Sequence, residues 1–291
     1  MSESKQRWRL VFAREEAAQF MSHLDTAHAW ERALRRGKVP VATSEGFTPR
    51  PRLIFAAPLP LGMLAEHDLA DLYLAERLSR PKLRALLEES LPPGYRVRDL
   101  YDVWVNAPAV ATQLVAADYR LTLLGVDPAG LEAAVRRLLA ADELPREKRR
   151  ERKVTSYDLR PLILDLQIRP PDEASAAAAA REAVVAAGLW LRLRHTQDQG
   201  SGRTEEVVAA LADQLGMAVA PAPGSVEPTA DGEAAQPHTA PEAQAIAVPN
   251  SRHGPKPELP ILEVVSPVRE RLWLGEDLVP DKAIPARRTA G

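Results

Sequence analysis

The sequence contains no cysteine among its 291 residues. Without a thiol, the chain cannot form disulfides, hold a cysteine-ligated zinc ion or iron–sulfur cluster, or use a thiolate nucleophile. Aromatic residues are also scarce, at 5%, so aliphatic side chains must supply most of the core. No apolar run approaches the roughly 20 residues of a membrane-spanning helix. The charged N-terminus lacks the apolar segment of a secretory signal. We therefore expect a cytoplasmic protein with no membrane association.

The overall composition is that of a folded protein, with 45% hydrophobic and 27% charged residues. The formal net charge is -2, which by itself does not suggest nucleic acid as a partner. A net charge near zero can still conceal an uneven distribution of charged groups. The positions of the basic residues are therefore more informative than their number.

The first part of the chain predicts an α+β arrangement in the order β-α-β-β-α-β. Alternating apolar residues indicate strands, and capped runs of helical period indicate helices. The expected strands cover residues 8–13, 39–43, 69–74 and 95–105, and the expected helices cover residues 22–36 and 80–90. Residues 53–57 are expected to pair briefly. This order is typical of a ferredoxin-like fold, in which both helices cover one face of an antiparallel sheet.

The residues that follow begin in the same way. We expect strands at 117–124, 144–152, 159–168 and 189–195, helices at 127–140 and 204–215, and an alanine-rich helical insertion within 173–187. The sequence thus predicts two ferredoxin-like halves with antiparallel sheets, residues 1–110 and 111–217. Residues 218–258 are rich in proline and alanine without periodicity, which predicts a disordered linker. Residues 259–291 are expected to form an edge strand and a basic tail.

The first predicted helix carries the clearest polar face. At 100° per residue, Leu24, Ala27, Trp30 and Leu34 should face the sheet. A second arc combines a carboxylate, an imidazole and guanidinium groups: Asp25, His28, Arg32 and Arg35, with Arg36 near its edge and Ser22 and His23 at the helix start. This arc is either a solvated face with weak ion pairs or a face that binds phosphate or carboxylate groups.

The loop after the second expected strand contains Ser44, Glu45, Phe47, Arg50 and Arg52 between prolines. Proline restricts the backbone, so the two arginines would be held outward at low entropic cost. An aromatic ring with flanking arginines suits stacking and phosphate contact with single-stranded RNA or a nucleotide. The alternative is a rigid structural loop in which Phe47 caps the core.

A second basic segment lies at an expected β-hairpin. It contains six basic residues against two acidic ones, the basic residues being Arg146, Lys148, Arg149, Arg150, Arg152 and Lys153. Such a segment is either a solvated hairpin tip or a contact to an RNA backbone.

Signals for catalysis are weaker than signals for binding. His23 and Asp25 are candidate acid–base residues, but two residues apart they do not share a helix face. His23, His28, Asp25 and Glu45 match no established metal-ligand spacing, so we predict no metal site. The sequence has no P-loop, dinucleotide-binding glycine motif or nucleophile elbow, and we predict no cofactor.

Several of these residues also occur in a recognisable pattern. The pattern comprises Ser22 to Asp25, Glu31 to Arg36, Ser44, Gly46-Phe47, Pro49, Pro51, Pro58 to Gly62, and Tyr157 to Leu162. It resembles a bacterial family of radical SAM-linked proteins, a domain of unknown function. The chain departs from the family pattern at His28, where arginine is common, and at Thr48 to Pro51, where Asn-Pro-His-Pro is common.

The resemblance implies a radical SAM enzyme as partner. The chain cannot itself be that enzyme, because it has no cysteines to hold the cluster. We therefore expect an accessory protein that works with a radical SAM enzyme and binds RNA or presents a phosphate-bearing substrate. Two alternatives stay open. The protein could be a stand-alone enzyme that uses His23 and Asp25 on RNA or a nucleotide, or a protein–protein adaptor that exposes the apolar segment Leu59 to Leu64.

Overall fold

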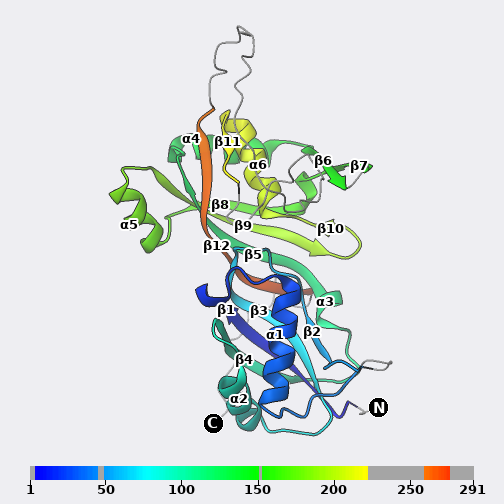
Figure 1. Ribbon diagram of the computed structural model, residues 1–291. Helices are drawn as coiled ribbons and strands as arrows, with labels where there is room; N and C mark the ends of the chain where they lie inside the picture. Colours follow the sequence, from blue (N-terminus) through cyan, green and yellow to red (C-terminus); the bar gives the residue numbers. More distant parts are fainter. Residues whose placement is uncertain (1–3, 45–48, 151–152, 222–258, 276–291) are drawn as a thin grey trace, which may run out of the picture.

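The computed structural model describes residues 4–44, 49–150, 153–221 and 259–275. It confirms the α+β class. The strands in this part of the chain form one ten-stranded mixed sheet and a separate two-stranded hairpin. Figure 1 shows two halves joined through the shared sheet, with helices α1 and α2 beside the lower strands and α4 and α6 beside the upper ones. The antiparallel sheets predicted for the two halves are joined into one mixed sheet, because β12 pairs with β3 in parallel.

The N-terminal half follows the predicted order of elements. Its elements are β1 Gln6–Arg14, α1 His23–Arg36, β2 Leu53–Phe55, β3 Leu64–Leu74, α2 Arg80–Ser90 and β4 Tyr95–Val103, with a 3-10 helix at Glu16–Ala18. The strands lie in the order β4-β1-β3-β2, and each neighbouring pair is antiparallel. The strand expected at 39–43 is reduced to two isolated bridges, Val41 with Leu74 and Thr43 with Pro51. Prolines in this region have no N–H to donate to a ladder.

The second half has the strand order β8-β9-β5-β12, again with antiparallel neighbours. Its main elements are β5 Leu114–Leu124, α4 Pro128–Ala140, β8 Ile163–Arg169, β9 Ala186–Thr196, α6 Thr204–Leu215 and β12 Ile261–Leu274. Smaller elements are α3 Val110–Gln113, β6 Pro145–Arg150, β7 Lys153–Asp158, a 3-10 helix Arg160–Leu162, α5 Glu173–Arg181, β10 Gly200–Ser201 and β11 Ala218–Val219.

Two predictions for this half are corrected. The expected strands 144–152 and 159–168 are in fact three strands, because β6 and β7 form their own hairpin before β8 begins at Ile163. Neither hairpin strand offers an alternating apolar face to pack on the core. The segment expected at an edge is instead an interior strand, since β12 pairs with β5 on one side and with β3 on the other. Of the expected linker, 222–258 lies outside the described residues, as does the tail 276–291.

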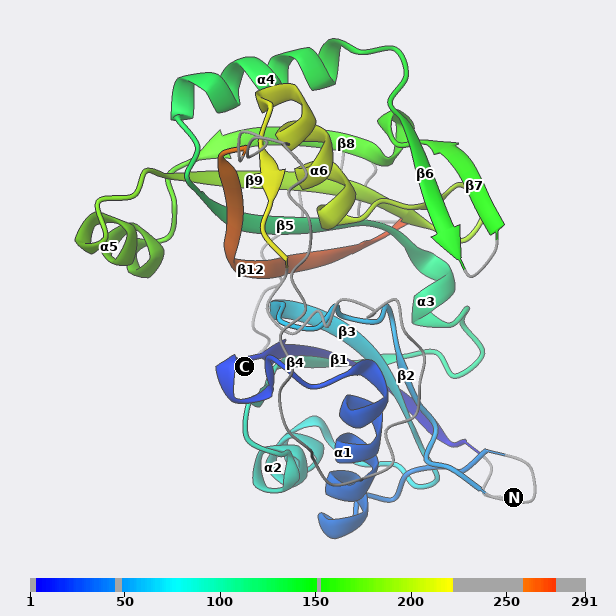
Figure 2. The same ribbon diagram turned by 45° about the horizontal axis from the view of Figure 1, so that its top comes forward.

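Strand β12 joins the two halves. It runs antiparallel to β5 over most of its length and pairs in parallel with β3 at Val268–Leu64 and Arg269–Ala65. Figure 2 shows β12 between the upper and lower strands. The last described segment of the chain therefore completes the sheet begun by the first residues, which is a tertiary contact that no local pattern specifies.

Helices cover one face of the sheet in each half. In the N-terminal half, Trp30 of α1 is fully buried and packs edge-on against Phe12, with 5.0 Å between the ring centroids. In the second half, Leu131 of α4 and Leu211 of α6 are fully buried in a separate core cluster. The prediction that Leu24 faces the sheet is wrong, because this side chain is 60% exposed. It lies in the first turn of α1, opposite the buried residues.

The other face of the second half is closed by a ladder of arginine and tryptophan side chains. Arg169 and Arg192 lie over the ring of Trp190, at 4.3 and 5.4 Å from its centroid. Arg192 and Arg271 lie over Trp273, at 4.6 and 5.1 Å. Guanidinium groups over aromatic rings are attracted to the ring quadrupole. The ladder thus covers two large aromatic rings on this face of the sheet.

None of the helices in the described ranges is long and apolar enough to cross a bilayer.

A buried ion pair ties β12 to the N-terminal half. Arg269 donates from Nε to Asp68 Oδ1 at 2.8 Å and from Nη2 to Asp68 Oδ2 at 2.6 Å. The same guanidinium donates to the carbonyl oxygens of Pro58 at 3.0 Å and Ala57 at 3.3 Å. Arg269 is only 1% exposed. A buried charge is tolerated when its partners satisfy it in this way, and removing one partner leaves the other unpaired.

We predict that Arg269→Met lowers the free energy of unfolding by about 3–5 kcal/mol, because Asp68 would be left as an unpaired buried charge. Urea denaturation followed by circular dichroism measures this change. Arg136→Met is the control, since the Arg136–Glu132 pair is on the surface and such pairs contribute about 0–1 kcal/mol. Similar losses in both variants would contradict the role given to Arg269.

A titratable side chain lies in the same environment. His195 of β9 has a buried Nδ1 atom with no hydrogen-bond partner among the described residues. Burial, with a smaller contribution from the positive charge of Arg269, lowers the pKa of His195 from 6.5 to about 4. The folded protein therefore keeps this imidazole neutral at pH values where the unfolded chain binds a proton.

We predict that the protein loses stability as the pH falls from 6.5 towards 4, by up to about 3 kcal/mol from this residue. Above pH 6.5 His195 costs no stability, because it is neutral in both the folded and the unfolded state. His195→Gln should flatten the dependence of the urea midpoint on pH within this window. An unchanged slope in the variant would show that His195 is not the titrating group.

Candidate functional site

The N-terminus of α1 is capped by the Ser22 side chain. The Ser22 side chain accepts a hydrogen bond from the backbone N–H of Asp25 at 3.1 Å and donates to Asp25 Oδ2 at 2.6 Å. In a complete capping box the Asp25 carboxylate would accept the backbone N–H of Ser22, whereas here it accepts the Ser22 hydroxyl. Asp25 is therefore engaged in holding the helix start.

The side chains of His23 and Asp25 have different partners in this structure. The His23 ring packs edge-on against Phe55, with 5.8 Å between centroids. No hydrogen bond joins His23 to Asp25, and Asp25 bonds instead to Ser22. Among the described residues, no group of three or more His, Asp or Glu is arranged to hold a metal ion.

The predicted polar arc of α1 lies on its solvent side. Arg32 and Arg35 are exposed and His28 is half-buried. Neither Arg32 nor Arg35 forms an ion pair within the described residues, whereas Arg80, Arg96 and Arg136 each pair with a carboxylate. Arg36 turns towards α2 and donates to the carbonyl oxygen of Ser90 at 2.7 Å. Two guanidinium groups of the arc are therefore available to a ligand.

Not all residues of the proline-rich loop 44–52 lie at the polar face of α1. At its base, the Ser44 hydroxyl accepts the N–H of Arg50 at 3.0 Å. Glu45 and Phe47 lie outside the described residues. Arg52 turns away from α1, donates to Ser4 Oγ at 2.6 Å and lies 4.1 Å from the centroid of the Tyr73 ring. Tyr73 alternates with Leu72 and Leu74, which pack in the α1 core, so Arg52 lies on the opposite sheet face.

The basic segment forms the predicted hairpin, with Arg146 opposite Tyr157 and Arg150 opposite Lys153. Arg146 does not project freely, because it pairs with Asp213 of α6 at 2.6 Å. The structure places the backbone of Lys148, Arg149, Arg150 and Lys153 on the two hairpin strands. Arg152 lies outside the described residues.

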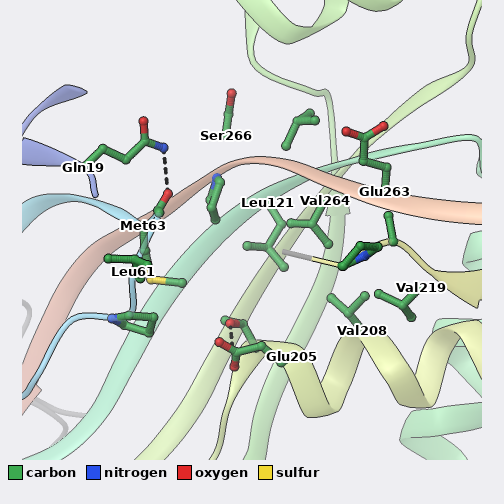
Figure 3. Close-up of a pocket in the computed structure, with 17 residues that line it drawn as sticks. Gln19, Leu61, Met63, Leu121, Glu205, Val208, Val219, Glu263, Val264 and Ser266 are labelled. Carbon is green, nitrogen blue, oxygen red and sulfur yellow. Dashed lines mark hydrogen bonds between the residues drawn. The ribbon is translucent and has the colours of Figure 1, made fainter. Parts of the chain in front are cut away.

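A pocket of about 360 Å³ lies between the two halves. Figure 3 shows Leu61 and Met63 on one side, Val208 and Val219 on the other, and Leu121 with Val264 between them. Its polar lining residues are Gln19, Thr204, Glu205, Glu263 and Ser266. The volume falls within the roughly 300–1,000 Å³ of typical small-molecule sites.

Two buried arginines hold the loop that lines this pocket. Arg269 binds the carbonyl oxygens of Ala57 and Pro58, as described above. Arg14 donates to the carbonyl oxygens of Pro60 at 2.6 Å and Met63 at 3.0 Å. Gln19 adds a side-chain bond to the Gly62 carbonyl at 2.6 Å. The loop is therefore held in place without any ligand.

Reasoning from sequence singled out part of this loop but missed the pocket. The adaptor alternative predicts that the apolar segment Leu59 to Leu64 is an exposed surface. Instead Leu59 and Met63 are buried and Leu61 is 45% exposed, which counts against an extended exposed patch. The signal in the sequence was the Pro-Leu-Pro-Leu-Gly run. The other walls come from segments up to 200 residues away along the chain, which no local pattern could connect.

Fold and site together define an α+β protein of two halves that share one sheet and enclose a pocket between them. Residues 7–198 match a family described as an uncharacterized protein conserved in bacteria, DUF2344. Because the match covers more than half of the chain, the protein belongs to this family. The family description names no activity and no partner, so the radical SAM enzyme stays a prediction.

Comparison with other proteins adds no functional assignment. No curated protein matches the sequence. Among solved structures, the chain is similar to one described as an RAMP protein binding different RNA substrates, at 12% identity over 69% of this chain and 96% of that chain, with a TM-score of 0.20. It is also similar to a carbohydrate oxidase from Microdochium nivale, at 12% identity over 73% of this chain and 44% of that chain, with a TM-score of 0.18. At these TM-scores neither likeness carries an argument.

Proposed function

We propose that this protein is an RNA-binding accessory protein. The observation that carries the proposal is the pair Arg32 and Arg35, which lie exposed on one face of α1 without a carboxylate partner among the described residues. Two other exposed arginines, Arg80 and Arg96, are neutralised by Asp99 and Glu15. Guanidinium groups bind phosphate oxygens bidentately, and RNA supplies phosphates at regular spacing.

The hairpin β6–β7 is the second contact in this proposal, because its sequence concentrates basic residues on a short projecting element. The pocket between the halves is not the site for the backbone phosphates. Its charged lining residues are Glu205 and Glu263, and these carboxylates would repel a phosphate. Backbone contact is therefore assigned to the helix face and the hairpin.

Two further parts of the proposal concern the fold of the two halves and the partner protein. We infer that the halves are two ferredoxin-like units, supported by the equivalent strand orders β4-β1-β3-β2 and β12-β5-β9-β8 with helices on one face. We also infer that the protein works with a radical SAM enzyme. This inference rests on the motif resemblance, and on the absence of cysteine, which leaves cluster chemistry to another chain.

We predict that the double variant Arg32→Glu/Arg35→Glu binds a mixed-sequence single-stranded oligoribonucleotide about tenfold more weakly or worse. Fluorescence anisotropy across a series of salt concentrations measures this. The slope of log K against log salt should become less negative by about 1.4, because the variant loses two phosphate contacts and each contributes about 0.7 for a single strand. Arg136→Glu is the control and should leave binding unchanged. Salt-insensitive binding, or equal losses in both variants, would contradict the proposal.

We predict that the tagged protein co-purifies with a radical SAM enzyme from its own organism, under anaerobic conditions that preserve iron–sulfur clusters. Mass spectrometry identifies the partner, and iron analysis shows whether the cluster is present. The Arg32→Glu/Arg35→Glu variant should retain the partner while losing RNA, because the proposal assigns these residues to phosphates. If RNA co-purifies and no radical SAM enzyme does, the proposed accessory role is contradicted while the proposed RNA binding is supported.

A further inference from the structure

The pocket between the halves has a charge that the RNA-binding surfaces do not share. Its walls are mostly apolar, and Figure 3 places Glu205 and Glu263 on opposite sides of the floor formed by Leu121 and Val264. Within the described residues, its lining contains no lysine, arginine or histidine. A ligand with a negative charge would therefore meet two carboxylates and no counter-charge.

The two carboxylates remain unneutralised within the described part of the chain, where neither forms an ion pair. Glu205 lies in the first turn of α6, where the helix dipole stabilises an ionised carboxylate. The Thr204 hydroxyl donates to Glu205 Oε2 at 3.3 Å. Neither contact supplies a cation to the Glu205 carboxylate.

The walls are fixed before any ligand enters. The loop with Leu61 and Met63 is held by Arg14 and Gln19, as described above. Strand β12, which pairs with β3 at Leu64 next to Met63, has a register shift between Val265 and Val268, and Ser266 within it adopts a φ of 47°. Residues rarely adopt this conformation unless surrounding contacts enforce it, and such positions concentrate at binding sites. Here Ser266 Oγ lies 2.9 Å from Ser175 Oγ of α5.

We propose that this pocket binds a small organic cation, namely a hydrocarbon or aromatic group that carries a protonated amine. The apolar walls remove the hydrocarbon part from water, and the carboxylates of Glu205 and Glu263 attract the ammonium group. The volume accommodates a compact small molecule and not a folded partner. The proposal is independent of RNA binding, since it uses none of the residues assigned to phosphate.

Isothermal titration of the full chain with cyclohexylammonium, phenethylammonium and tryptammonium tests the proposal. At least one should bind saturably, and its neutral alcohol analogue should bind about tenfold more weakly. Glu205→Gln should weaken binding by a similar factor. Glu173→Gln is the matched control, because Glu173 also lies in the first turn of a helix, α5, and does not line the pocket.

Two filling variants separate binding in the pocket from binding elsewhere. Val208→Trp should abolish binding by occupying the cavity. Because Val208 is buried, a variant that fails to fold is replaced by Leu61→Trp, which fills the pocket from its half-exposed rim. No saturable binding of any of these amines, equal binding of amine and alcohol, or full binding in the filled, folded variant would overturn the proposal.

Discussion

The structure depends on the buried ion pair between Arg269 and Asp68. It connects the last described strand to the third one and, through the carbonyl oxygens of Ala57 and Pro58, fixes the loop that lines the pocket. Two hydrogen-bonded register positions alone would be a small contact between the halves. A desolvated guanidinium with all these acceptors adds directional constraints that apolar packing does not provide. This ion pair thus adds directional contacts to the apolar packing that joins the two halves, in which Leu59, Met63 and Leu69 share one core cluster with the second half.

The same residue type has three uses in this protein. Arg14 and Arg269 are buried and hold backbone carbonyls in place. Arg192 is stacked between two tryptophans and paired with Asp118, so it helps to cover one face of the sheet. Arg32 and Arg35 are exposed and unpaired within the described residues. The near-zero net charge hides this division, because the paired arginines cancel carboxylates while the exposed ones remain available to a ligand.

Helix starts were predictable where a nearby side chain caps the helix. Ser22 begins α1 through its own side chain, and Asp127 caps α4 by accepting the N–H of Gly130 at 2.8 Å. Predictions failed where neighbours decide the outcome. Leu24 was assigned to the core from helical period alone, although the adjoining residues Thr26, Ala29 and Trp30 define the buried face. The hairpin β6–β7 was merged into longer strands, because the alternation that would separate them from β8 is absent.

By itself, the sequence determined the α+β class, the order of elements in the first half, the caps at Ser22 and Asp127, and the basic character of α1. These properties depend on residues within a few positions of each other, through capping hydrogen bonds and hydrophobic period. The tertiary structure decided that β12 lies inside the sheet, that Arg52 and Arg32 face opposite sides, and that an acidic, apolar pocket forms between the halves. Those outcomes require contacts across 200 residues, such as Arg269 with Asp68, and burial of a charge is settled only when its distant partners are present.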